Sequence, residues 1–176
     1  KTFVFISKQG WIKQTRMTEF EPWRTYKSRP LSGMKLKSED DELVAVYLED
    51  GQTGLDVFLV THQGMGLRYP LQEVPVVGTK AAGVKSINLK EEDIVVNGLL
   101  VIAEGDTPIV IVTQRGAVKR MLAQEISQTS RAKRGVTVLR ELKKNPHRII
   151  YMSEGKSKEM TVINQKGQEL VIDPTD

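Results

Sequence analysis

Hydrophobic and polar positions follow each other in short runs along the chain, and one such run recurs at a nearly constant interval. Four copies each combine an apolar stretch, a few polar residues and a glycine, and they cover residues 3–10, 57–64, 109–116 and 160–167. The closing glycines are 54, 52 and 51 residues apart. A repeat of this length predicts a propeller-like or solenoid array, in which neighbouring units cover each other's apolar faces.

Each repeat continues with the same series of runs, so we expect about four β-strands in a unit. A second run ends in an acid and an apolar residue, and a polar, basic connection then leads to a second glycine at Gly33, Gly83 or Gly135. A short alternating run and a longer apolar run close the unit. Such Val-, Ile- and Phe-rich runs between Gly, Asn and Asp are typical of strands. Only residues 122–126 and 139–144 resemble short helices.

The predicted fold is therefore all-β, a partial wheel of four-stranded blades. We expect blades at residues 1–52, 53–106 and 107–158 and an incomplete blade at 159–176. Closed propellers usually have about four to eight blades, and this chain starts within a strand at Lys1. We therefore predict a piece of a larger wheel; the alternative is a complete open array.

The composition excludes several kinds of site. Cysteine is absent, which excludes disulfides and thiolate metal sites, and the two histidines, His62 and His147, lack metal-ligand spacing. No apolar run approaches the roughly 18 residues of a membrane span, and we expect no signal peptide. We expect no membrane span, no metal and no cofactor in this fragment.

Positive charge is concentrated in the third unit. Residues 107–158 hold 12 basic and 3 acidic side chains, whereas residues 1–52 hold 9 and 8, residues 53–106 hold 4 and 7, and residues 159–176 hold 1 and 4. A focused basic surface raises the local concentration of polyanions. This pattern favours nucleic acid or another polyanion as a partner over an ordinary solvated surface.

The basic residues also recur at matching places of the units, which predicts a basic band around one rim. Such a band could contact the phosphate backbone of bending DNA without reading the DNA sequence. One set lies in the connection before the second glycine, and another follows the first glycine. Together with Lys85 they form the predicted DNA-binding set: Arg24, Lys27, Arg29, Lys80, Arg131, Lys133 and Arg134 in the connections, and Lys13, Arg16, Arg68, Lys119 and Arg120 after the first glycine.

Acidic residues recur too, just before the last strand of the first two units. They form the stretches 39–42 and 91–93. Paired carboxylates can perform acid–base chemistry, but recurrence in a loop indicates a structural role. We expect these acids at a face opposite the basic rim, where they would repel DNA.

The basic connections at residues 21–28, 73–85 and 129–136 resemble those in the C-terminal domain of bacterial type IIA topoisomerase A subunits. The likeness runs from Phe3 to Ile172 and is closest to the topoisomerase IV A subunit (ParC) of Gram-positive bacteria. It implies a β-pinwheel, whose four-stranded blades exchange one strand with a neighbour. It also implies a domain that binds and bends double-stranded DNA along its rim and presents it to the cleavage core.

The resemblance extends to the parent enzyme. It implies an A-subunit homodimer joined to the B subunit in an A2B2 complex that uses ATP and Mg²⁺ through its other domains and subunit. It further implies a cytoplasmic, nucleoid-associated protein, and it leaves peripheral membrane association open. The catalytic tyrosine of the family belongs to the core, so we assign no catalytic residue here, including Tyr26, Tyr47, Tyr69 and Tyr151.

The gyrase members of this family carry the box Gln-Arg-Arg-Gly-Gly-Lys-Gly, which this chain lacks. Residues 129–135 are its nearest relative and keep a basic pair and the closing glycine. The difference favours topoisomerase IV, with decatenation and relaxation, over a gyrase A-subunit domain. A propeller that docks proteins remains a second alternative. An independent enzyme is a third, for which the sequence shows no set of nucleophile, base and metal ligands.

Overall fold

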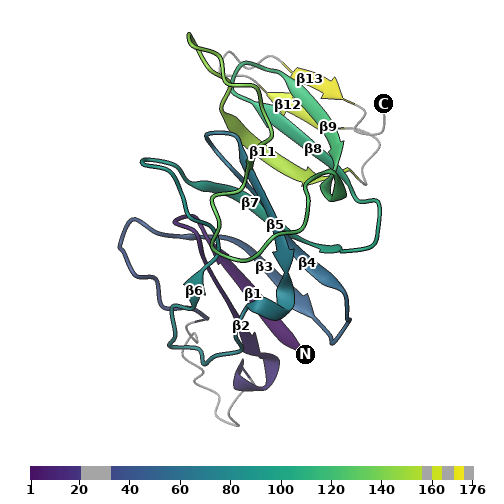
Figure 1. Cartoon of the computed structure of the whole chain (residues 1–176). Coiled ribbons are helices and arrows are strands. Elements are labelled where there is room, and N and C mark those ends of the chain that lie inside the picture. Colours follow the sequence, from purple (N-terminus) through teal and green to yellow (C-terminus); the bar gives the residue numbers. More distant parts are fainter. Residues whose placement is uncertain (21–32, 156–159, 164–168, 173–176) are drawn as a thin grey trace.

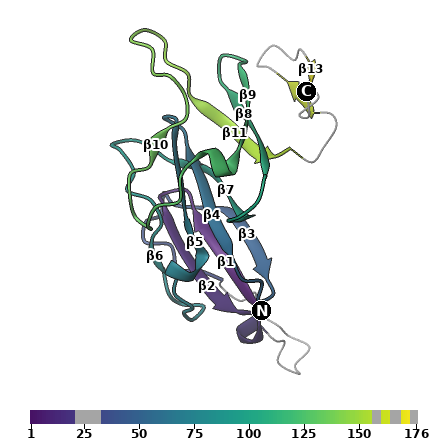
Figure 2. The same cartoon turned by 45° about the vertical axis from the view of Figure 1, so that its right-hand side comes forward.

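The computed structural model describes residues 1–20, 33–155, 160–163 and 169–172, and these residues form β-strands joined by turns and three short 3₁₀ helices. No α-helix occurs among the described residues, so none of them forms a helix that could cross a membrane. The sheets follow one another along the molecule in chain order (Figures 1 and 2). The prediction of an all-β, propeller-like fold is confirmed.

Three sheets and a final strand pair make up this architecture. The first sheet has the order β3-β1-β2-β6, the second β10-β5-β4-β7, the third β11-β8-β9, and the last pair is β12-β13. The bounds are β1 Thr2–Ser7, β2 Trp11–Arg16, β3 Leu43–Glu49, β4 Leu55–Thr61, β5 Met65–Pro70, β6 Val84–Lys85, β7 Val95–Ile102, β8 Pro108–Thr113, β9 Val118–Leu122, β10 Val136–Thr137, β11 Ile149–Glu154, β12 Met160–Ile163 and β13 Glu169–Ile172; the 3₁₀ helices are η1 Met17–Phe20, η2 Leu71–Glu73 and η3 Ala123–Glu125.

Neighbouring units exchange one short strand. β6 follows β5 in the chain but pairs with β2 of the first sheet, where Lys85 lies opposite Trp11. β10 follows β9 but pairs with β5 of the second sheet, where Val136 lies opposite Gly66. Each exchanged strand is only two residues long. The exchange that the family resemblance implies is thus confirmed at two successive junctions.

A glycine before each exchanged strand makes the close approach possible. Gly83 has a φ of +81° and Gly135 a φ of +88°, in the left-handed region that favours glycine. A Cβ on Gly83 would lie 2.2 Å from the backbone oxygen of Ile12, and one on Gly135 would lie 2.3 Å from that of Gly66. At these two positions the second glycine of the repeat is therefore required by contact with the neighbouring unit.

Substituting Gly135 tests this role. We expect Gly135→Ala to lower the free energy of unfolding by about 2–3 kcal/mol, because the left-handed backbone and the clash both oppose the side chain. Gly116 is the matched control, since its φ is +79° and an added Cβ would meet nothing within 4 Å. Urea denaturation of both variants measures the difference. Equal losses of unfolding free energy in the two variants would show that the clash with the Gly66 backbone does not destabilise the fold.

The core lies between units, as the repeat predicts. Alternate residues of a strand point to opposite faces, so Val4 and Ile6 of β1 pack against Val57 and Leu59 of β4. The other face of β4 carries Phe58 and Val60, which join β8 and β11 residues in a second cluster. All the residues named here are fully buried. Each unit is therefore stabilised by its neighbours.

Neither of the two segments that resemble short helices forms an α-helix. Residues 122–126 contain only the single 3₁₀ turn η3, and residues 139–144 form no helix. The second prediction is wrong. Isolated helices shorter than about 12 residues are marginal in water, and of the two leucines in this segment only Leu139 packs against the core, while Leu142 is exposed.

Candidate nucleic-acid interface

The basic connections of the second and third units run along the outer strand of the unit before them. In the first junction, the Gln14 N–H donates to the Pro75 carbonyl (3.1 Å), and the Val77 N–H donates to the Gln14 carbonyl (2.8 Å). In the second junction, the Thr129 N–H donates to the Arg68 carbonyl (2.8 Å). The exchanged strand then completes the pairing. The connections are thereby held on the outer edge of the sheets, before β6 and β10.

Cations from two units meet at the second junction. The Ala132 N–H donates to the Ser86 carbonyl and the Asn88 N–H donates to the Lys133 carbonyl, both at 2.9 Å. Because of these bonds, residues 131–134 of the third unit lie against residues 85–88 of the second unit. The side chains of Lys85, Lys133 and Arg134 are all exposed there.

The first junction repeats this arrangement with fewer charges. The Lys35 N–H donates to the Ala81 carbonyl at 3.2 Å, so Lys35 of the first unit lies beside the connection that carries Lys80. Both side chains are exposed. The predicted set omitted Lys35, although it follows Gly33 at the same spacing at which Lys85 follows Gly83. We call the exposed set the outer-edge cations: Lys35, Lys80, Lys85, Lys133 and Arg134.

Arg131 is half-buried and holds this surface together. Its Nε–H donates to the Glu73 carbonyl at 3.1 Å, and its NH1 group donates to the Lys85 carbonyl at 2.8 Å. Its backbone N–H donates to the Glu73 carboxylate at 3.1 Å. Arg131 therefore acts as a positioning residue that fixes Lys85 beside the third unit's connection.

Two members of the predicted set lie inside the fold, which corrects the expectation that they face DNA. Lys13 is fully buried, and its Nζ donates to the carbonyls of Gly78 (2.8 Å) and Thr79 (3.2 Å). Desolvation by burial lowers the pKa of Lys13, while the charge of Glu19 opposes the shift. Arg68 is 7% exposed. Both side chains are covered because the next unit's connection passes over them.

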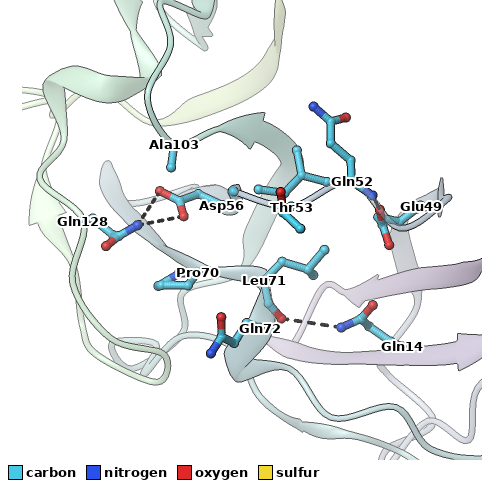
Figure 3. A pocket seen from close by; sticks show the side chains of 12 residues that line it. Gln14, Glu49, Gln52, Thr53, Asp56, Pro70, Leu71, Gln72, Ala103 and Gln128 are labelled. Atoms are coloured by element: carbon cyan, nitrogen blue, oxygen red, sulfur yellow. Dashed lines mark hydrogen bonds between the residues drawn. The ribbon is translucent and has the colours of Figure 1, made fainter.

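Arg68 forms a buried ion pair that joins the second and third units. Its NH1 group lies 2.6 Å from Asp56 Oδ2, and its Nε–H donates to the Ile126 carbonyl at 2.7 Å. Gln128 of the third unit donates to Asp56 Oδ1 at 2.9 Å. Figure 3 shows Gln128 hydrogen-bonded to the Asp56 carboxylate, among the residues that line a groove between elements of successive units.

The first unit has uncharged hydrogen bonds at the positions equivalent to Asp56 and Arg68. Gln14 pairs with Val4 as Arg68 pairs with Phe58, so the two side chains occupy equivalent positions. The Thr2 hydroxyl donates to Gln14 Oε1 at 2.9 Å, and Gln14 Nε2 donates to the Val74 carbonyl at 3.0 Å. Through these bonds, Gln14 and Arg68 each hold the connection of the following unit on the outer edge.

The other predicted residues are spread over several places. Lys119 and Arg120 lie on β9, where Lys119 is exposed and its Nζ donates to the Val138 carbonyl at 2.6 Å, and Arg120 is half-buried. Arg16 is exposed at the end of β2. Arg24, Lys27 and Arg29 lie outside the described residues. The structure therefore brings Lys85 together with Lys133 and Arg134, and Lys80 together with Lys35, but does not group the whole predicted set.

The recurrent acids have a structural role. Asp41 and Asp93 are buried, and one carboxylate oxygen of each accepts two backbone N–H bonds at 2.8–2.9 Å. These bonds come from the tight turn of the same unit and from the residue after the acid. His147 occupies the equivalent place in the third unit, where its Nδ1 lies 3.0 Å from the Thr113 hydroxyl. Part of each acidic stretch thus fastens a loop to a turn.

Two tyrosines serve as packing groups. The Tyr47 hydroxyl donates to the Gly98 carbonyl of the next unit at 2.6 Å, and Tyr69 is fully buried with its hydroxyl 2.6 Å from Ser86 Oγ. Burial raises the pKa of both phenols. Within the described residues, no cluster of three His, Asp or Glu side chains could hold a metal ion.

The sequence of the chain is similar to that of known proteins. A family model described as "DNA gyrase C-terminal domain, beta-propeller" matches residues 1–48, 55–102 and 107–153. The A subunit of DNA topoisomerase 4 from Bacillus subtilis (strain 168) is 50% identical over 147 residues, and its counterpart in Streptococcus pneumoniae serotype 4 is 46% identical over 151 residues. Both matches cover 84% of this chain, and they span 17% of the length of each relative.

Solved structures show the same likeness. The crystal structure of the C-terminal domain of DNA topoisomerase IV superposes with a TM-score of 0.88 at 42% identity, covering 99% of this chain and 53% of that one. The C-terminal domain of DNA gyrase A superposes with a TM-score of 0.69 at 16% identity, covering 98% and 54%. The second match shows the fold alone.

Proposed function

The chain belongs to the family of the DNA gyrase A C-terminal domain, and from that premise we propose that it binds and bends duplex DNA as the C-terminal domain of a topoisomerase IV A subunit. The outer-edge cations are the observation that supports this proposal. They come from three successive units, they are exposed, and backbone pairing between units holds them on one edge. We take the division at residues 1–52, 53–106, 107–158 and 159–176 as part of the proposal.

The chemistry of the surface favours contact with the phosphate backbone. Lysine and arginine side chains on a curved edge can neutralise successive phosphates as a duplex bends around it. None of the outer-edge cations lines the grooves beside Asp56 and Arg68, and all of them are exposed. Contacts with phosphates carry no sequence information. Smooth bending of a 20–30 bp duplex costs on the order of 1–6 kcal/mol, which the phosphate contacts must offset.

The relatives support topoisomerase IV over gyrase. The two described above are subunits of DNA topoisomerase 4, and residues 129–135 lack the gyrase box. We therefore propose that the domain presents DNA to the cleavage core for decatenation and relaxation during chromosome segregation. In this proposal the parent enzyme is an A2B2 complex in the cytoplasm, bound to the nucleoid, and its other parts use ATP and Mg²⁺.

Bending is tested with a 30-bp duplex that carries a fluorescent donor at one end and an acceptor at the other. We expect the protein to raise energy transfer, because a bend around the outer edge shortens the end-to-end distance. Duplexes of three unrelated sequences should respond alike. A mobility shift without a change in energy transfer would contradict bending, and the absence of both would contradict DNA binding.

A further inference from the structure

A second side of the molecule carries a charge pattern that the outer edge does not explain. Loops at residues 34–42, 86–94 and 138–148 lead into the last strand of each sheet, and in Figure 1 all three project from the left side of the sheets. Each is joined to the tight turn of its unit. Lys8, His62 and Gln114 donate their N–H groups to the carbonyls of Glu42, Ile94 and Arg148 at 2.8–3.0 Å. We call this side the turn end.

The sign of the charge reverses along the turn end. The first loop has two basic and four acidic residues, the second one and three, and the third four and one. The single acid of the third loop, Glu141, lies 3.8 Å from Arg148. Arg140, Lys143 and Lys144 are exposed, and no ion pair involves them among the described residues. Arg115 adds a further exposed cation from the adjoining turn.

Hydrogen bonds hold the third loop against its turn. The Arg115 NH1 group donates to the Asn145 carbonyl at 3.0 Å, and Gln114 Nε2 donates to the Pro146 carbonyl at 2.8 Å. The contact between His147 and the Thr113 hydroxyl completes this attachment. The cations of the turn and of the loop are therefore kept on one surface, which reduces the entropy lost on binding an anion.

The third loop also continues directly from the outer edge. It begins after β10, the exchanged strand that follows Lys133 and Arg134 in the chain, and Figure 2 shows it rising from β10 away from the sheets. A duplex on the outer edge could therefore reach this loop, whereas the acidic loops of the first two units would repel it. Continuity with the outer-edge cations favours DNA over an acidic protein as the occupant.

We propose that the turn end of the third unit is a second contact surface for duplex DNA, formed by Arg115, Arg140, Lys143 and Lys144. The proposal rests on the DNA-binding function and adds the place at which the duplex leaves the outer edge. The acidic loops confine this exit to one unit. The basic residues of the third unit thus serve two surfaces.

Salt-dependent binding of a 40-bp duplex tests the proposal. Lys143→Gln/Lys144→Gln should weaken binding by roughly 50-fold near 0.1 M salt and flatten the slope of log affinity against log salt by about 1.8, or about 0.9 per phosphate contact. The matched control is Lys8→Gln/Lys90→Gln, which removes the same charge from the turn end of the acidic units. Lys133→Gln/Arg134→Gln reports the outer edge separately.

Site-specific crosslinking supplies the second readout, because the chain has no cysteine of its own. A photoreactive aryl azide is attached to Leu142→Cys in the third loop or to Ser38→Cys in the first. We expect the duplex to crosslink at position 142 and not at position 38.

The outcomes separate the two proposals. If only the outer-edge pair weakens binding and position 142 does not crosslink, the second surface is wrong and DNA binding stands. If neither pair weakens binding more than the control, both proposals fail. Crosslinking of position 142 to a hexaglutamate peptide but not to the duplex would assign the surface to a protein and overturn this inference.

Discussion

Replacing Lys85, Lys133 and Arg134 together with alanine is expected to weaken binding of a 30-bp duplex by about 10²- to 10³-fold near 0.1 M salt. Each phosphate contact that is lost removes about 0.9 from the slope of log affinity against log salt, so three contacts account for an effect of this size. Backbone bonds bring these side chains together at the second junction. Fluorescence anisotropy measures the loss, which should be equal for unrelated sequences.

The control for this variant removes the same net charge elsewhere. Lys8→Ala/Lys37→Ala/Lys90→Ala takes three lysines from the turn end of the first two units, whose loops also carry seven acidic residues. We expect a loss of only a few-fold from long-range electrostatics, which salt screens within about 10 Å at 0.1 M. Equal losses in the two triple variants would show that net charge, and not the outer edge, determines the affinity. A loss confined to one sequence would indicate base readout.

The second large effect is expected at the buried ion pair. Asp56→Ala should lower the free energy of unfolding by about 3–5 kcal/mol, because it leaves the Arg68 guanidinium buried without its counterion. Asp56 is 1% exposed and its carboxylate also accepts the bond from Gln128. The variant therefore loosens the contact between the second and third units as well as the pair itself. Urea denaturation at fixed pH measures the change.

Two further variants separate the charge from the packing. Asp56→Ala/Arg68→Met removes both charges and should recover a large part of the loss, since no ion is then buried alone. Thr2→Ala removes the equivalent neutral partner in the first unit and should cost about 1 kcal/mol, as for an ordinary hydrogen bond. A cost for Asp56→Ala no greater than that of Thr2→Ala would mean that the ion pair does not hold the units together.

The architecture could be predicted from the sequence because it depends on spacing. Gly83 and Gly135 mark the place where a strand crosses to the neighbouring unit, and at each of them an added Cβ would lie 2.2 or 2.3 Å from a backbone oxygen. The apolar run from Phe3 to Ile6 similarly indicated a strand, and its counterparts recur in every unit. Such features repeat, and repetition is visible without coordinates.

The candidate surface was predicted less completely, because exposure depends on what the next unit covers. Lys13 and Arg68 share the charge of the outer-edge cations, yet the following connection buries both. No local pattern distinguishes a lysine that donates to the Gly78 carbonyl from one that faces solvent. Lys35 was missed although it lies in the same kind of run as Lys85. The spacing from Gly33 could have identified it.

The most direct test of the central claim is a salt titration of duplex binding by the unaltered chain. If the five outer-edge cations each contact a phosphate, log affinity should fall against log salt with a slope of about −4.5 or steeper. The slope should be the same for duplexes of unrelated sequence. An affinity that does not change between about 50 and 200 mM salt would contradict a DNA-binding surface built from these side chains.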